Sequence, residues 1–478
     1  MARRIVRREF LGAAAAGAFG AACAFGRSPA YAGLPIVSPG CRRTKVRVAR
    51  LYLGVPGALW PTPKMDLAEE RRRYDAEFAK RAKDFADVEF VVDELLTNAE
   101  GAKKIADRLK DVDGILAIHL SMGITGILRE ILAAGKPTVL YAAPYSGHEW
   151  ASFGSLRREP IGAKLECLLT SDPDGLAVAI RPFRAIHHLR EAKILNVTAH
   201  EMSADYLKAV REKFGTEIVR VPRERVLAAY ESVPVPEAEA EGKRWIDGAE
   251  KVVEPDRDEI VRSARLALAF EKLLADEDAT VITADCYGSM YRQLPAFPCI
   301  GFTRLNDMGL GGICESDLRS AMTHIIFQGL AGRPGFVSDP TVDESKRSII
   351  LAHCLGSRKM DGPQGEAAPY KLRCIMERQE GAVAQVRMRV GQKVTQAWLI
   401  GTDLMVYFTG TVIEVPDHER GCRTKINVRV DGDIEALWQN WSHGLHRQTC
   451  YGDIVADLRR FARFMDIRLV DEAAPKTA

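Results

Sequence analysis

The amino-acid sequence predicts an α/β protein with two Rossmann-like parallel-sheet domains, followed by a β-rich, barrel-like C-terminal domain. Strand-like and helix-like segments alternate from residue 45 onward, and the hydrophobic period changes to two from Lys371. The composition is 47% hydrophobic, 27% charged and 7% aromatic, as in folded globular chains. The 478 residues are enough for about three domains.

Residues 1–32 have the features of a twin-arginine export signal. Arg7 and Arg8 precede an apolar, Ala/Gly-rich run at 12–26, and Ala30-Tyr31-Ala32 matches a cleavage site. The run is too short and too rich in glycine to span a bilayer. We therefore expect export to the periplasm without stable membrane insertion, or a cytoplasmic protein if the signal is not used.

Charge and cysteine content exclude other classes. The net charge of +3 comes from five arginines within residues 1–32, and the rest of the chain is close to neutral, so nucleic acid is not an expected partner. Nine cysteines follow Ala32, without CxxC pairs. This odd, scattered set argues against a disulfide framework or a zinc ribbon, and we expect most of these residues to be small buried apolar groups.

The first domain is expected at 44–190. It has predicted strands at 46–54, 88–95, 114–120 and 137–143 and predicted helices at 67–85 and 99–109. Ligands bind such parallel sheets beyond the carboxyl ends of the strands, which draws attention to His148 in the segment 144–150.

The second domain is expected at 191–365 and the β-rich domain at 366–478. The second domain has predicted strands at 194–198, 217–221 and 280–284, a linker or helix edge at 232–240, and a long helix at 256–274. Apolar and polar residues alternate at 384–390 and 426–430, which together with 392–401 and 404–415 predicts antiparallel strands of a small barrel or sandwich. A closing helix is expected at 453–464.

Four residues stand at the ends of predicted elements in the last third of the chain. Glu315 is expected to open a helix at 315–330, and Asp339 precedes Pro340, which is expected to stop the apolar stretch before it. His353 ends a predicted strand, and His446 lies between the barrel and the last helix. Two carboxylates with one or two imidazoles suit Mn²⁺, Mg²⁺ or Co²⁺. The same residue types also fit a helix first turn, a turn before proline and buried core histidines.

Five further residues are candidates for substrate binding. Arg304, Asn306 and Asp307 are polar residues close to Glu315 in sequence, although a capped turn with a surface ion pair explains them equally well. Trp441 offers either a stacking face for a sugar or a core side chain. His148 could reach the site of a neighbouring subunit.

Several motifs resemble the L-fucose isomerase/L-arabinose isomerase family. They are the runs 298–309 and 314–317, Gly332-Arg333-Pro334 with Asp339, 352–354, and His446 followed by 451–453. The resemblance covers essentially the whole chain after the signal and implies a metal-dependent aldose–ketose isomerase that acts on a fucose- or arabinose-like sugar through a cis-enediol. It implies that Glu315 and Asp339 are acidic ligands that share the proton transfers, with His446 as a third ligand. His353 matches a ligand of the arabinose isomerase branch.

The resemblance also implies a divalent cofactor, Mn²⁺ first, and a homo-oligomer, a trimer or hexamer. The sequence departs from the family pattern where Arg447 follows His446 in place of a paired histidine, and in its export signal. Two alternatives therefore remain open: an exported sugar-binding protein, and a repurposed relative that acts on a sugar derivative.

Overall fold

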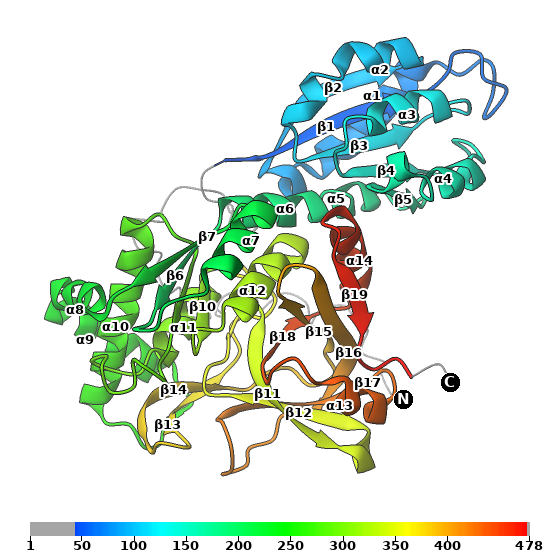
Figure 1. Cartoon of the computed structure of the whole chain (residues 1–478). Helices are drawn as coiled ribbons and strands as arrows, with labels where there is room; N and C mark the ends of the chain where they lie inside the picture. The colour runs from blue at the N-terminus through cyan, green and yellow to red at the C-terminus, as the bar shows by residue number, and fades with distance from the viewer. Residues whose placement is uncertain (1–43, 476–478) are drawn as a thin grey trace, which may run out of the picture. The chain divides into compact units, whose positions relative to one another are not determined.

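The first parallel sheet contains five strands in the order β2-β1-β3-β4-β5 (Figure 1). The computed structural model describes residues 44–475, so the expected signal at 1–32 lies outside the described residues. The strands are β1 (Val46–Leu53), β2 (Val88–Leu96), β3 (Gly114–His119), β4 (Thr138–Ala142) and β5 (Leu165–Leu169). The crossovers carry α1 (Leu67–Lys80), α2 (Ala99–Ile105), α3 (Thr125–Leu132) and α4 (Trp150–Leu156). Strands β3 and β4 are buried along their whole length, as expected where helices cover both faces of a parallel sheet.

The second parallel sheet has the order β10-β9-β6-β7. Its strands are β6 (Lys193–Val197), β7 (Glu217–Val221), β9 (Val281–Ala284) and β10 (Gly311–Cys314). The helices from the first sheet onward are α5 (Gly175–Val178), α6 (Arg181–Glu191), α7 (Ala204–Phe214), α8 (Arg223–Ser232), α9 (Val235–Gly248), α10 (Arg257–Asp276), α11 (Cys299–Asp307) and α12 (Leu318–Ala331). The segment expected as a linker or helix edge at 232–240 is mostly the start of α9. Since all pairs are parallel, the carboxyl ends of β6, β9 and β10 meet at one edge.

The third sheet closes into a barrel. Its order is β15-β18-β11-β12-β17-β16-β19, and β15 also pairs with β16. The strands are β11 (Phe336–Asp343), β12 (Ser348–His353), β15 (Lys393–Ile400), β16 (Leu404–Glu414), β17 (Thr424–Val430), β18 (Arg447–Tyr451) and β19 (Arg468–Asp471), with helices α13 (Ile434–Asn440) and α14 (Val455–Phe464). The predicted fold class, two parallel-sheet α/β domains and a barrel, is confirmed. The barrel takes its first two strands, β11 and β12, from residues before 366.

Two local expectations are wrong. The alternating segment at 384–390 does not form a barrel strand: β14 (Glu380–Val386) pairs with β13 (Tyr370–Ile375), and β13 pairs with β8 (Lys251–Val252) in a separate small sheet. Pro340 does not end its strand, since β11 runs on to Asp343. The pairing of β11 with β18 stops at Ser338, so Pro340 lies where the strand has a partner only in β12, a position that tolerates a missing N–H.

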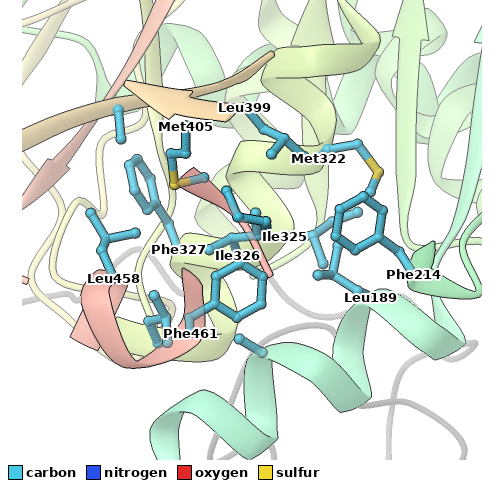
Figure 2. Packing of buried hydrophobic residues seen from close by; sticks show 14 of the residues in the cluster. Leu189, Phe214, Met322, Ile325, Ile326, Phe327, Leu399, Met405, Leu458 and Phe461 are labelled. Carbon is cyan, nitrogen blue, oxygen red and sulfur yellow. The ribbon is translucent and has the colours of Figure 1, made fainter. Parts of the chain in front are cut away.

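Helix α12 is packed on all sides. Figure 2 shows Met322, Ile325, Ile326 and Phe327 of this helix among apolar side chains from α6, α7, the barrel and α14. Every residue of α12 from Ser320 to Leu330 is buried, the polar side chains of His324 and Gln328 included, so the helix lies in the core. This packing holds the turn that precedes α12, which contains Glu315. Among residues 44–475, no helix combines the length and the apolar character needed to cross a bilayer.

Candidate metal centre

Glu315 follows β10 directly, at the carboxyl edge of the second sheet. Its φ is 59°, and that of Ser316 is 55°, so both residues adopt the left-handed conformation that non-glycine residues seldom occupy. Helix α12 starts only at Leu318, with Asp317 as its N-cap, whose Oδ1 accepts the Ser320 N–H at 2.9 Å. The expectation that Glu315 opens the helix is therefore wrong. Strained backbone of this kind concentrates at functional sites.

The barrel register brings the other three residues to one place. Asp339 on β11 pairs with Ala352 on β12, the neighbour of His353. Ser338 on β11 pairs with Arg447 on β18, the neighbour of His446. Asp339 and His353 thus come from adjacent strands, and His446 directly precedes a third, although more than 90 residues separate His353 from His446.

All four predicted ligands meet. The His446 Nε2 atom lies 3.4 Å from Asp339 Oδ1 and 3.7 Å from Glu315 Oε2. The His353 Nε2 atom lies 3.8 Å from Glu315 Oε1, and the two imidazole centroids are 5.3 Å apart. Donor atoms of Asp339, His353 and His446 all lie within 4.8 Å of one another. This spacing allows one cation to contact them together.

The unpaired polar atoms of this cluster fit a cation. Both ring nitrogens of His353 and Asp339 Oδ1 are buried and make no hydrogen bond within the described part of the chain. Each such atom costs about 1–3 kcal/mol when it is left without a partner. A metal ion would bind the Asp339 oxygen and the His353 ring nitrogen that carries no proton, and these donors suit a hard or borderline dication.

Burial also sets the protonation of the cluster. It raises the pKa of the Glu315 carboxyl, an effect that His446 opposes and Asp339 reinforces. It raises the pKa of the Asp339 carboxyl as well, and His446 offsets only part of this. Burial lowers the pKa of His353 to about 3, so this imidazole is neutral and can donate a lone pair at physiological pH.

Asp317, to which the sequence alone assigns no role, orients His446. Its Oδ2 atom lies 3.1 Å from His446 Nδ1. Burial by itself lowers the pKa of His446, but the hydrogen bond to Asp317, together with the charges of Asp317, Glu315 and Asp339, outweighs burial, so the pKa of His446 is raised. The pKa of Asp317 falls below its usual value. A proton held on Nδ1 leaves Nε2 free for a metal, as carboxylate partners of metal-binding histidines do. The sequence feature that could have pointed to Asp317 is its position two residues after Glu315. By itself, this position indicates only a helix cap.

Arg304, Asn306 and Asp307 do not join the cluster. Arg304 is 3% exposed and pairs with Glu241 at 3.0 Å and Glu271 at 2.9 Å. Asn306 bonds both the N–H and the carbonyl of Gly312 on β10, and Asp307 pairs with Arg358 at 2.6 Å. Of the three, Asn306 holds the strand that leads to Glu315, and the other two make buried ion pairs in the interior.

The remaining two candidates also lie outside the cluster. The Trp441 indole donates to the Leu445 carbonyl at 3.2 Å, and the Arg447 guanidinium lies 4.3 Å from its ring centroid. Trp441 therefore holds the loop that carries His446. His148 follows β4 and packs edge-on against Trp60, with the ring centroids 5.3 Å apart.

Asp285 is a further residue that the sequence analysis missed. It follows β9 at the same sheet edge and accepts hydrogen bonds from the backbone N–H and hydroxyl of Ser289. Its charge contributes to the raised pKa of Glu315. Only the parallel pairing of β9 with β10 reveals this proximity.

The fold and the site define a class: an α/β protein with a barrel, in which two carboxylates and two imidazoles surround a position suited to a divalent cation. No family profile matches the chain. The chain is similar to a sulfoquinovose isomerase from Alkalicoccus urumqiensis, 24% identical over 329 residues, or 63% of this chain and 71% of that protein. It is also similar to a sulfoquinovose isomerase from Clostridium sp. (strain MSTE9), 24% identical over 231 residues, or 45% of this chain and 48% of that protein. These similarities support the expectation of a sugar isomerase at the level of reaction class.

Proposed function

We propose that the protein is a divalent-metal-dependent aldose–ketose isomerase that works through a cis-enediol. The observation that carries the proposal is the convergence of Glu315, Asp339, His353 and His446, with buried unpaired donor atoms on Asp339 and His353. These four residues would hold the cation, with Mn²⁺ as the first candidate and Mg²⁺ or Co²⁺ as alternatives.

The reaction requires removal of a proton from a carbon next to a carbonyl. When bound, the cation supplies Lewis-acid polarisation of the carbonyl and stabilises the charge that develops on oxygen. One of the carboxylates, Glu315 or Asp339, takes the proton from C2 and returns it to C1. The other serves the proton transfer between O1 and O2. Asp317 keeps His446 in the orientation seen here, and the neutral His353 adds a donor without adding charge.

The substrate we propose is an open-chain aldose. The family resemblance favours a fucose- or arabinose-like sugar, and the names of the two relatives add sulfoquinovose. Export through the signal at 1–32 and assembly into a trimer or hexamer are further parts of the proposal, supported by the sequence pattern and by the family resemblance.

Hydrogen exchange tests the reaction directly. Mn²⁺-loaded protein is incubated in D₂O with L-fucose, L-arabinose, D-arabinose and sulfoquinovose, and deuterium at C1 and C2 is measured by NMR. We expect exchange with at least one sugar, and none with Glu315→Gln. Asp256→Asn, a conservative change at the N-cap of α10, is the matched control and should exchange normally. Absence of exchange across a broad panel would favour a sugar-binding protein or a repurposed enzyme.

A further inference from the structure

Two cysteines and a glutamate meet beside the candidate metal centre. Strands β12 and β17 are antiparallel, with His353 opposite Thr424. Cys354 follows β12 and Cys422 lies two residues before β17, so this ladder places the two thiols next to each other. Glu377 joins them from the turn between β13 and β14.

Their donor atoms lie within reach of a single ion. The Cys422 Sγ atom is 3.3 Å from Glu377 Oε1, and the Cys354 Sγ atom is 3.8 Å from Glu377 Oε2. All three donor atoms lie within 4.8 Å of one another. The Tyr287 hydroxyl, 3.5 Å from Glu377 Oε2, is a fourth polar group at this position. Cys354 is buried, Cys422 is partly exposed and Glu377 is exposed, so an ion can enter from solvent.

The charge of Glu377 has no cationic partner among residues 44–475. Its carboxylate contacts two thiols and a phenol. The adjacent Arg378 guanidinium instead stacks on the rings of Tyr287 and Tyr291. Arg423, next to Cys422, is committed to Glu254 and Glu419. Within the described part of the chain, Glu377 thus carries a negative charge that no ion pair neutralises, beside two thiols.

We propose that Cys354, Cys422 and Glu377 form a second metal site, for a cation that prefers thiolate ligands, such as Zn²⁺. Thiolates favour zinc and softer ions, whereas the carboxylates and imidazoles at Glu315 suit harder or borderline ions. Each cysteine gives its proton to solvent as the sulfur–metal bond forms. Because Cys354 directly follows His353, metal at this site anchors the end of β12. The proposal does not depend on the isomerase activity.

The test uses the full chain, stripped of metal by a chelator and titrated with Co²⁺. Only thiolate ligands give the near-ultraviolet sulfur-to-cobalt charge-transfer band. We expect the band in the wild type and in Cys167→Ser, the matched control on β5 outside the cluster. Cys422→Ser should lose the band and bind Zn²⁺ at least about tenfold more weakly, while Glu377→Gln keeps the band at reduced affinity. Glu315→Gln should keep the band, which separates the two sites.

Three results would overturn the proposal. The first is a wild type without the thiolate band. The second is an unchanged thiolate band in Cys422→Ser. The third is a disulfide between Cys354 and Cys422, found by peptide mapping without reductant, because a disulfide excludes metal. Circular dichroism of each variant checks that it is folded. Because Cys354 is buried and Cys422 is partly exposed, the comparison uses the Cys422 variant.

Discussion

Replacement of Asp317 by asparagine tests whether the orientation of His446 matters for metal binding, because His446 itself is left in place. Asn is nearly as good an N-cap as Asp, so α12 should begin normally. The amide nitrogen would face His446 Nδ1, where the carboxylate lies 3.1 Å away in the native protein. His446 Nδ1 would then have to accept a hydrogen bond, which places the ring proton on Nε2, the atom that faces Glu315 and Asp339.

The expected loss follows from this change of tautomer. Carboxylates that orient metal-binding histidines contribute about 10–100-fold to metal affinity, or about 1.4–2.7 kcal/mol. We therefore expect Asp317→Asn to weaken Mn²⁺ binding by that factor in isothermal titration calorimetry, with a thermal midpoint close to that of the wild type. Asp256→Asn, which changes an equivalent cap on α10, should bind Mn²⁺ normally. If Asp317→Asn binds Mn²⁺ as tightly as the wild type, His446 is not a ligand held by Asp317.

Three other predictions test the structure more broadly. Dialysis against a chelator should abolish turnover, and Mn²⁺ should restore it, as measured by ketose formation; activity that survives chelation would contradict a metal-dependent reaction. Arg304→Met breaks two buried ion pairs, one with Glu271 and one with Glu241, which keeps its contact with Arg244, so denaturant unfolding should show a loss of about 3–5 kcal/mol, with KM for the sugar unchanged in the folded enzyme. A raised KM would instead place Arg304 at the substrate. Burial lowers the pKa of His324 from 6.5 to about 4, so the unfolded chain binds a proton that the folded chain does not. The free energy of unfolding should therefore fall by roughly 3 kcal/mol from this group as the pH drops through that window, and the fall should be smaller in His324→Asn. Equal pH dependence in the two proteins would rule out this role for His324.

Local periodicity predicted much of the fold. Strand β1 at Val46–Leu53 and helix α10 at Arg257–Asp276 lie within one or two residues of their predicted bounds. Local periodicity does not predict which strands pair with each other, because pairing depends on residues far away in sequence. The segment at 384–390 has the alternation of a barrel strand, yet β14 pairs with β13, and the barrel recruits β11 and β12 instead.

Sequence motifs were enough to name the four candidate ligands. The positions of these side chains relative to one another could not be predicted from the sequence. The left-handed backbone of Glu315 and Ser316 gives no signal in a sequence that lacks glycine at these positions. The bond from Asp317 to His446 joins residues 129 positions apart. Arg304 belongs to the same motif as the site, but the structure commits it to an interior ion pair. Proximity in sequence was a poor guide to the substrate pocket, because α11 turns its polar residues into the protein.

The most direct measurement is an anomalous-difference map from crystals grown with Mn²⁺. We predict one strong peak within coordination distance, about 2.0–2.3 Å, of oxygens from Glu315 and Asp339 and of His446 Nε2. A map without a peak among these side chains, at a manganese concentration that supports turnover, would contradict the metal centre and the isomerase that depends on it.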